Sequence, residues 1–314
     1  MSVQPPRLRR VLCALNLDGS GDESWPLASL IAHRFGASLD ALHAPSPLLS
    51  FGNRADRVRR LIAEHGARER LEGLVAPLGS SLSVSTYVTR GQASAVILSH
   101  SERRASDLIV LGASSAATGT VTPVSTGASC AVLSVPSAGG GRALRRILLP
   151  IGALVADIPA TAWAISLASR FGAEVSVLRV GASKPGFWKV LTSRRCLEAP
   201  PLEQQHAAVV RAGATSLRLK RAGVQAPGVE LLEPADYEAI ADHGESGGFD
   251  LIVMGMHTQG DAATDGQGIV ADLRRRATIP VLSVRDLRQP ASFATIDHEA
   301  ARSRGGDAQF ALSA

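Results

Sequence analysis

Residues 249–270, FDLIVMGMHTQGDAATDGQGIV, decide how this chain folds. Their apolar run at 251–254 is too short for a helix and stands between Asp250 and Gly255, which is typical of a strand buried on both faces. A glycine-rich loop without Lys or Arg follows, and a helical pattern then runs over residues 269–276. Strand, glycine loop and helix in this order aim backbone N–H groups and a helix N-terminus at a phosphate. The stretch therefore predicts an α/β unit with a phosphate-type loop.

The same strand occurs twice in the chain. Residues 107–112 read DLIVLG and residues 250–255 read DLIVMG, 143 residues later. Three other pairs bracket them in the same order: RRVL at 9–12 with RRIL at 145–148, FGA at 35–37 and 171–173, and VLSV at 132–135 and 281–284. Four colinear matches indicate two copies of one domain. The offset grows from 136 to 143 to 149, so copy two gains 7 residues before the repeated strand and 6 after it.

Strands alternate with helices in each copy, which predicts right-handed βαβ units and parallel sheets. The predicted fold class is α/β: two tandem five-stranded parallel open sheets of the Rossmann-like type, which form a pseudo-dimer by meeting at their VLSV strands. We predict one domain at 1–138 and a second at 142–286, joined by a glycine-rich linker at 138–141. Residues 181–205 are interpreted as a mobile surface loop, and residues 287–314 as a disordered tail. Expected strands lie at residues 9–17, 39–44, 83–88, 107–111, 131–135, 146–151, 174–180, 229–232, 251–254 and 281–284.

The composition narrows the class of function. An aromatic content of 4% argues against a base-stacking nucleic-acid platform, which needs exposed rings. The net charge is +5, from 33 Lys and Arg and 28 Asp and Glu residues. We interpret the basic clusters, including Arg274-Arg275-Arg276, as solvated helix faces. The three cysteines show no metal spacing, and no apolar run has the length of a membrane span or a signal peptide, so we expect a cytoplasmic protein without a metal or membrane partner. The motifs of hydrolases, Walker-type nucleotidases and zinc proteases are missing, so we expect no enzyme activity.

Each half resembles the universal stress protein family, and the whole chain resembles a tandem universal stress protein. The resemblance rests on His43 at the end of strand two, on Arg90-Gly91 after strand three, and on the DLIV and VLSV strands already quoted. It implies a five-stranded adenine nucleotide alpha hydrolase-like domain, which binds ATP or AMP in some members. It also implies that domains pair through their last strands.

Members that bind ATP carry a loop of the form G-x2-G-x9-G-[S/T]. Copy two keeps the length of this loop through Gly255, Thr258, Gly268 and Ile269, but Thr258 replaces a glycine and Ile269 replaces the hydroxyl residue. His257 lies within the loop; we favour a solvated turn histidine over a phosphate or metal ligand there. Copy one keeps Gly112 but has only Ser115 and Gly119-Thr120 after it, so it lacks the middle of the loop.

The acidic residue that the family places after strand one is missing from both copies. Asn16 stands at that position in copy one and Gly152 in copy two. Copy two also brings Asp261 and Asp265 near the expected phosphates without a cation, which disfavours an anion by about 1 kcal/mol or more for each charge.

Two functional hypotheses follow. The first is a stress-response regulator with degenerate nucleotide sites that acts as a non-enzymatic scaffold for an unidentified protein partner. The second is an ATP- or AMP-binding regulator that uses only the copy-two loop, weakly. Pairing of two whole chains into a homodimer stays open. An apolar-basic tip at residues 184–189, with Phe187 and Trp188 beside two lysines, is a candidate docking point.

Overall fold

The computed structural model describes residues 6–17, 23–45, 54–113, 118–137, 143–151, 157–180, 202–232, 237–256 and 273–285. The first half runs β1 (Arg10–Leu15), α1 (Ser24–Phe35), β2 (Ser38–His43), α2 (Arg54–Val75), a 3-10 segment (Ala76–Ser81), β3 (Val84–Val88), α3 (Ala93–Arg104), β4 (Leu108–Gly112), α4 (Thr118–Gly127) and β5 (Ala131–Val135). The second half runs β6 (Arg146–Ile151), α5 (Asp157–Phe171), β7 (Glu174–Val180), α7 (Leu202–Arg221), β8 (Val229–Leu232), α8 (Tyr237–Ser246), β9 (Leu251–Met256), a helical turn at 273–276 and β10 (Val281–Arg285).

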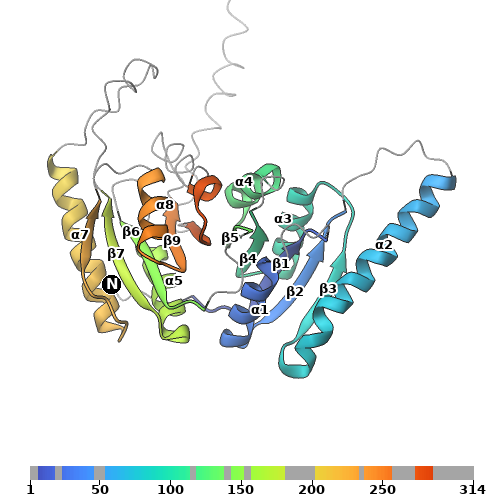
Figure 1. The fold of residues 1–314 in the computed structure, drawn as a ribbon, viewed down its shortest axis with the longest axis horizontal. Coiled ribbons are helices and arrows are strands. Elements are labelled where there is room, and N and C mark those ends of the chain that lie inside the picture. The colour runs from blue at the N-terminus through green and yellow to red at the C-terminus, as the bar shows by residue number, and fades with distance from the viewer. Residues whose placement is uncertain are drawn as a thin grey trace, which may run out of the picture.

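The ten strands among the described residues form one sheet in the order β3-β2-β1-β4-β5-β10-β9-β6-β7-β8. Within each half the strands are parallel, and both halves have the same internal order when read outward from the centre. The predicted α/β class with mostly parallel open sheets is confirmed. Figure 1 shows the first half on the right and the second half on the left, with helices on both faces of the sheet.

The halves join through β5 and β10, which pair antiparallel. The Ser134 hydroxyl donates to the carbonyl of Val281 at 3.1 Å, and the Ser283 hydroxyl donates to the carbonyl of Val132 at 3.0 Å. Both serines belong to the repeated VLSV strand, so the two hydroxyls make the same bond in opposite directions. The two five-stranded sheets are therefore continuous at the place where the sequence predicts their meeting.

The repeated Asp before each DLIV strand has the same structural role in both halves. In the first half Asp107 Oδ2 accepts from the backbone N–H groups of Arg9 and Arg10 at 2.7 and 2.9 Å. In the second half Asp250 Oδ2 accepts from the backbone N–H groups of the corresponding arginines, at 2.8 and 2.9 Å. A carboxylate that accepts two backbone N–H groups holds the start of one strand against its neighbour. The motif is thus conserved between the copies for a structural reason.

The hydrophobic core differs between the two faces of the sheet. On the face covered by α1, α2, α5 and α7, one cluster runs through both halves and includes Ile31, Leu133 and Leu167. On the other face each half has its own cluster, one around Val124 and one around Leu273. Buried apolar area is the main stabilising contribution to a fold, at about 25 cal/mol per Å². The shared cluster therefore makes the stability of each half depend on the other.

Reciprocal contacts link α1 with α5 on the shared face. The Arg34 guanidinium lies 5.7 Å from the centre of the Phe171 ring, and the Arg170 guanidinium lies 5.5 Å from the centre of the Phe35 ring. Arg34 and Arg170 are 136 positions apart, as are Phe35 and Phe171, so they are equivalent residues of the repeat. The two halves are consequently related by a local pseudo-twofold axis.

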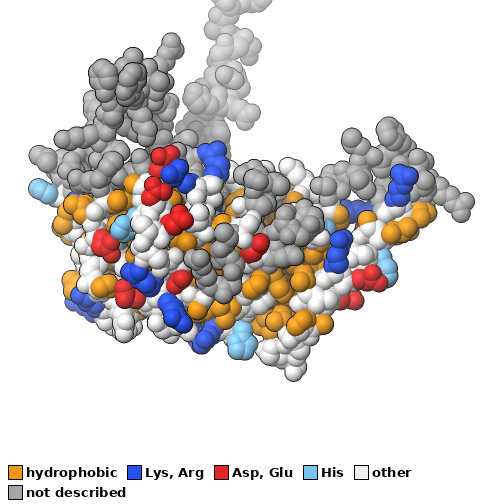
Figure 2. Space-filling model, in the orientation of Figure 1, with side chains coloured by type: hydrophobic (Ala, Val, Ile, Leu, Met, Phe, Trp, Pro, Cys, Tyr) orange, Lys and Arg blue, Asp and Glu red, His pale blue; other side chains and the backbone are white. Residues whose placement is uncertain are grey.

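Three sequence predictions need correction. The sequence predicts a long helix over about residues 54–78, and its helical spacing predicts that Val58, Leu61 and Ile62 lie on the packed side. Their side chains are instead 49%, 58% and 67% exposed. The reason is that the first half of α2 extends beyond the edge of the sheet, and Figure 2 shows hydrophobic side chains uncovered along it at the right of the view. Gly66 and Gly73 predict a kink in this helix, but α2 is continuous through both. The irregular backbone lies later, at Gly79 in the 3-10 segment, with φ 54° and ψ −142°. Finally, the predicted surface loop at 181–205 is too long, because α7 begins at Leu202.

Several predictions lie outside the described residues. They are the glycine-rich linker at 138–141, the apolar-basic tip at 184–189 and the tail at 287–314.

Candidate functional site

The strand order reverses between β1 and β4 in the first half and between β6 and β9 in the second. In open parallel sheets, ligands bind outside the carboxyl ends of the strands at such a reversal. The predicted nucleotide sites fall at these two places, because their residues follow β4 and β9 in the sequence.

In the second half the structure describes only part of the candidate site. Gly255 lies within β9, is buried and pairs with Val284 of β10. Gly152 directly follows β6 in the sequence, and His257 directly follows β9. Gly152, His257, Thr258, Gly268 and Ile269 lie outside the described residues, as do Asp261 and Asp265. Gly152 and His257 therefore follow neighbouring strands of the sheet, since β6 pairs with β9.

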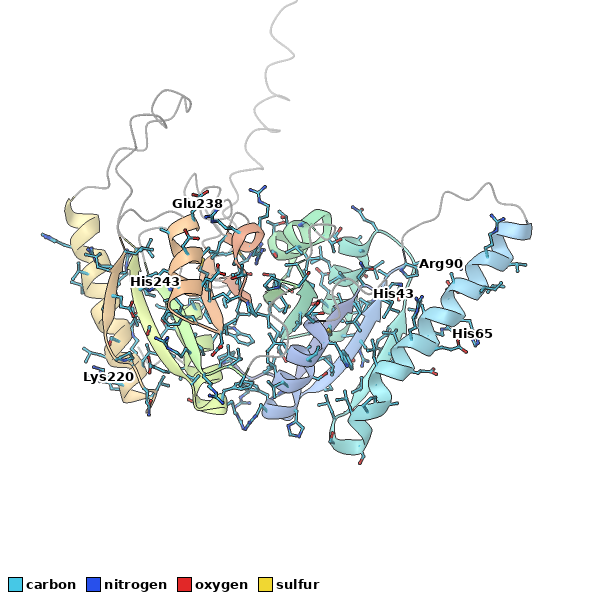
Figure 3. All side chains as sticks on the ribbon, in the orientation of Figure 1. His43, His65, Arg90, Lys220, Glu238 and His243 are labelled. Atoms are coloured by element: carbon cyan, nitrogen blue, oxygen red, sulfur yellow. The ribbon has the colours of Figure 1, made fainter. Side chains whose placement is uncertain are left out.

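In the first half the residues at the strand ends are mostly described. Asn16 follows β1 and is exposed, and it stands where the family resemblance requires a carboxylate. His43 ends β2, and its Nδ1–H donates to the carbonyl of Leu15 at 2.9 Å. This bond ties the imidazole to the neighbouring strand, as expected for a hydrogen-bonded strand histidine rather than a ligand. Figure 3 labels His43 and, nearby, Arg90.

The loop after β4 in the first half is short. Gly112 is the last residue of β4 and α4 begins at Thr118, so Gly119 and Thr120 lie in the first turn of that helix. The backbone N–H groups of a first helical turn have no partner within the helix. The cation nearest in sequence to the end of β3, Arg90, forms an ion pair with Glu64 of α2. Arg90 is therefore engaged with a carboxylate instead of standing free for a phosphate.

An unexpected arginine lies at the junction of the halves. Arg274 was expected on a solvated helix face, but it is only 7% exposed. Its Nη2 donates to the hydroxyl of Ser283, and its Nε has no hydrogen-bond partner within the described part of the chain. Burial lowers the pKa of Arg274 to about 9. No sequence pattern indicates this burial, because a basic run within a polar helix is usually solvated.

A second arginine crosses the same junction. Arg285, at the end of β10, donates through Nη2 to the carbonyl oxygens of Ser125 at 3.3 Å and of Thr126. These carbonyls lie in the last turn of α4, where a cation is favourable for the helix dipole. Burial lowers the pKa of Arg285. Arg285 therefore connects the second half directly to the first. Arg274 does so only through Ser283, whose hydroxyl donates to the carbonyl of Val132 in the first half.

A buried polar cluster lies beneath α3 in the first half. Asp40 on β2 is 1% exposed, and its Oδ2 accepts from Arg104 Nε at 3.1 Å and lies 3.4 Å from His100 Nε2. The Tyr87 ring meets the His100 ring edge-on, with 4.5 Å between centroids, and the Arg104 guanidinium lies 5.6 Å from the centre of the Tyr87 ring. Burial lowers the pKa of His100, while Asp40 opposes that shift. The cluster sits at the C-terminal part of α3, away from the end of β4 that leads to the loop.

The second half has an equivalent histidine. His243 is 143 positions after His100, and its Nε2 lies 3.0 Å from Glu230 Oε2 without the geometry of a hydrogen bond. Its ring stacks on Phe249, at 5.9 Å between centroids. The same offset that relates the DLIV strands relates these histidines, so the sequence did contain a signal for them.

The described residues contain no group of three or more His, Cys, Asp or Glu side chains able to hold a metal ion. No helix among them is both long and apolar enough to cross a membrane.

Comparison with known proteins identifies the second half. Residues 143–285 match the sequence model of the Universal stress protein family. They form one universal stress protein domain. The first half lies outside this match. A comparison with curated protein sequences gave no match.

Solved structures resemble the chain over both halves. A universal stress protein from Archaeoglobus fulgidus DSM 4304 aligns with 88% of this chain and 96% of its own, at 15% identity and a TM-score of 0.60. A functionally unknown protein from Pseudomonas aeruginosa PAO1 and a putative universal stress protein from P. aeruginosa UCBPP-PA14 each align with 88% of the chain, at 16% identity and a TM-score of 0.55. These alignments cover 92% and 93% of the respective proteins. At such identities the likeness establishes the fold, and the fold extends beyond the universal stress protein domain into the first half.

Proposed function

We propose that the chain is a tandem universal stress protein whose first half has lost nucleotide binding, and that it acts in the cytoplasm as a stress-response scaffold for a protein partner. The observation that carries the proposal is the short connection after β4. Gly112 and Gly119 are separated by 6 residues, whereas the corresponding Gly255 and Gly268 are separated by 12. A connection of half the length lacks the backbone N–H groups that would surround a chain of phosphates.

The pairing of the halves supports the tandem assignment. Equivalent residues make equivalent contacts across the junction: Ser134 and Ser283 at the strands, and Arg34 and Arg170 at the helices. Such reciprocity is the property of an isologous interface between two copies of one domain. It fits a first half that has the same ancestry as the universal stress protein domain in the second.

A second candidate function is weak ATP or AMP binding by the second half alone. The full loop length from Gly255 to Gly268 favours it. The replacement of the expected carboxylate by Gly152 and of the expected hydroxyl by Ile269 weakens it. A lost charge-assisted hydrogen bond costs about 1.5–3 kcal/mol. Two such losses carry a micromolar site to about millimolar, since each 1.4 kcal/mol is roughly a factor of ten.

Calorimetry with ATP and Mg²⁺ on the full chain tests the proposal. We expect a dissociation constant above about 100 μM and no release of phosphate. A constant below about 10 μM would contradict the scaffold function and support the second candidate. In that case Gly268→Asp should abolish binding, whereas Gly119→Asp, the matched change in the first half, should leave it unchanged.

A further inference from the structure

We propose that the cavity between α1 and α5 binds a small phosphate ester with an apolar body. The cavity has a volume of about 650 Å³ and lies where the two halves meet. Its walls come from both halves: the segment before β1 and the end of α1 on one side, and the C-terminal part of α5 on the other. The site does not depend on the proposed function, because it uses none of the residues of the phosphate-type loops.

Three arginines are among the residues that line the cavity: Arg7, Arg9 and Arg170. None of the described lining residues is Asp or Glu, so no carboxylate of the wall neutralises them. Arginine presents donors in a planar fork that matches the oxygens of phosphate and carboxylate groups. Three arginines on one cavity therefore fit a ligand with two or more negative charges better than a single carboxylate.

The arginines before β1 are held in place by the core. Leu8, between Arg7 and Arg9, is 6% exposed and belongs to the cluster shared by both halves. The backbone N–H of Arg9 is fixed by Asp107, and the backbone carbonyl of Arg9 accepts from the N–H of Ser38 at 2.9 Å. A side chain on a fixed backbone loses less conformational entropy when it binds a ligand.

The opposite wall positions the third arginine. Arg170 lies over the ring of Phe35, which itself lines the cavity. Ile165 adds apolar surface, and Ser166 and Ser169 add hydroxyl groups on the same wall. Apolar walls with a few convergent polar groups are typical of small-molecule sites. This mixture is what assigns an apolar body, and not only a phosphate, to the ligand.

The equivalent position across the pseudo-twofold axis lacks several of these groups. At an offset of 136, Ala143 stands for Arg7, Leu30 stands for Ser166 and His33 stands for Ser169. Arg34 over Phe171 is kept there. Arg7 and the hydroxyl groups of Ser166 and Ser169 thus have no counterpart on the other side of the axis, so we expect one ligand per chain.

The experiment measures binding of 1-naphthyl phosphate to the full chain by calorimetry. Inorganic pyrophosphate tests the charge without the apolar body, and 1-naphthol tests the body without the charge. We expect saturable binding of 1-naphthyl phosphate at one site, weaker binding of pyrophosphate, and no binding of 1-naphthol.

The variants distinguish an effect on ligand binding from an effect on the packing between the two halves. Arg170→Gln should weaken 1-naphthyl phosphate at least tenfold. Arg34→Gln removes the equivalent cation–ring contact on the other side of the axis, and it should change the affinity less than threefold. If Arg170→Gln fails to fold, Arg7→Ala decides the question, since Arg7 precedes the first strand and Ala is the residue that the second copy carries. Absence of saturable binding, equal weakening by Arg34→Gln and Arg170→Gln, or unchanged affinity in Arg7→Ala would each overturn the proposal.

Discussion

Leu133 of β5 faces Leu282 of β10 across the antiparallel pair, and the two leucines are the same residue of the repeat, 149 positions apart. On either side of them Val132 faces Ser283 and Ser134 faces Val281. Equivalent residues therefore exchange places about the Leu133–Leu282 pair, which marks the pseudo-twofold axis within the sheet. A one-residue shift of register would remove this correspondence and turn the buried serines toward the other face.

A fragment that ends at residue 138 should associate with itself. Without β10, the edge of β5 presents unpaired backbone groups and the apolar side chains that Leu282 covers in the full chain. Light scattering after size-exclusion chromatography should show dimers or larger species. Leu133→Lys in the same fragment, which puts a charge at the centre of the edge, should reduce association. A soluble, stably folded monomer from the unmodified fragment would count against the pairing.

Ser134 and Ser283, the two serines where β5 pairs with β10, should differ in their contribution to stability. Ser134→Ala removes one buried hydrogen bond, which costs about 0.5–1.5 kcal/mol in the free energy of unfolding. Ser283→Ala removes the equivalent bond and also the acceptor for Arg274, so it should cost more, about 2–4 kcal/mol in total. Urea unfolding of both variants tests the difference, and equal costs would argue against the contact with Arg274.

Replacement of Arg274 by Met should leave stability unchanged or raise it by about 1–4 kcal/mol at pH 7, as replacement of other buried charged groups by apolar residues does. Burial lowers the pKa of folded Arg274 to about 9, below the ordinary value of an arginine, so the unfolded chain binds more protons than the folded chain above pH 9. Stability of the wild type should therefore rise relative to Arg274→Met as the pH increases through 9 and above. A difference between the two chains that stays constant from pH 7 to pH 10 would contradict this.

Acid should destabilise the first half through His100. Burial lowers the pKa of this imidazole below 6.5 in the folded chain, so the native state favours the neutral form. The contribution of neutral His100 to the free energy of unfolding is present above the unfolded pKa of 6.5, and it is lost as the pH falls through the lower folded value. His100→Gln should reduce the fall in melting temperature between pH 7.5 and pH 5. An equal fall in the wild type and in His100→Gln would contradict this.

Much of the fold was predictable because the sequence pattern of one domain occurs twice in the chain. The strands β5, β6, β7 and β8 begin and end at the predicted residues, since a glycine or a proline lies directly beside each of these short, largely apolar runs. The meeting of the halves also followed from the sequence, because two identical VLSV edges are complementary to each other under a twofold relation.

Contacts between the halves were harder to predict. The burial of Arg274 depends on where a helical turn of one half lies against the seam, and no local pattern encodes that position. The exposure of Ile62 depends on how far α2 extends beyond β3 at the edge of the sheet. The helical periodicity of the apolar residues is the same whether that face of the helix is buried or exposed. Of the candidate nucleotide site, Gly255 was expected to open the loop after residue 254, but it lies within β9, which runs to Met256. The loop residues that follow β9 remain a prediction.

The pairing of β5 with β10 also has a consequence in time. Val281 is made 147 residues after Ser134, its partner in the sheet. At a synthesis rate of about 5–20 residues per second, the ribosome needs roughly 7–30 seconds to make that interval. For those seconds the nascent first half carries an uncovered VLSV edge, and the nascent first halves of neighbouring ribosomes on one message carry the same edge. During translation this edge is therefore open to pairing between nascent chains, and slow codons between β6 and β9 would lengthen the exposure.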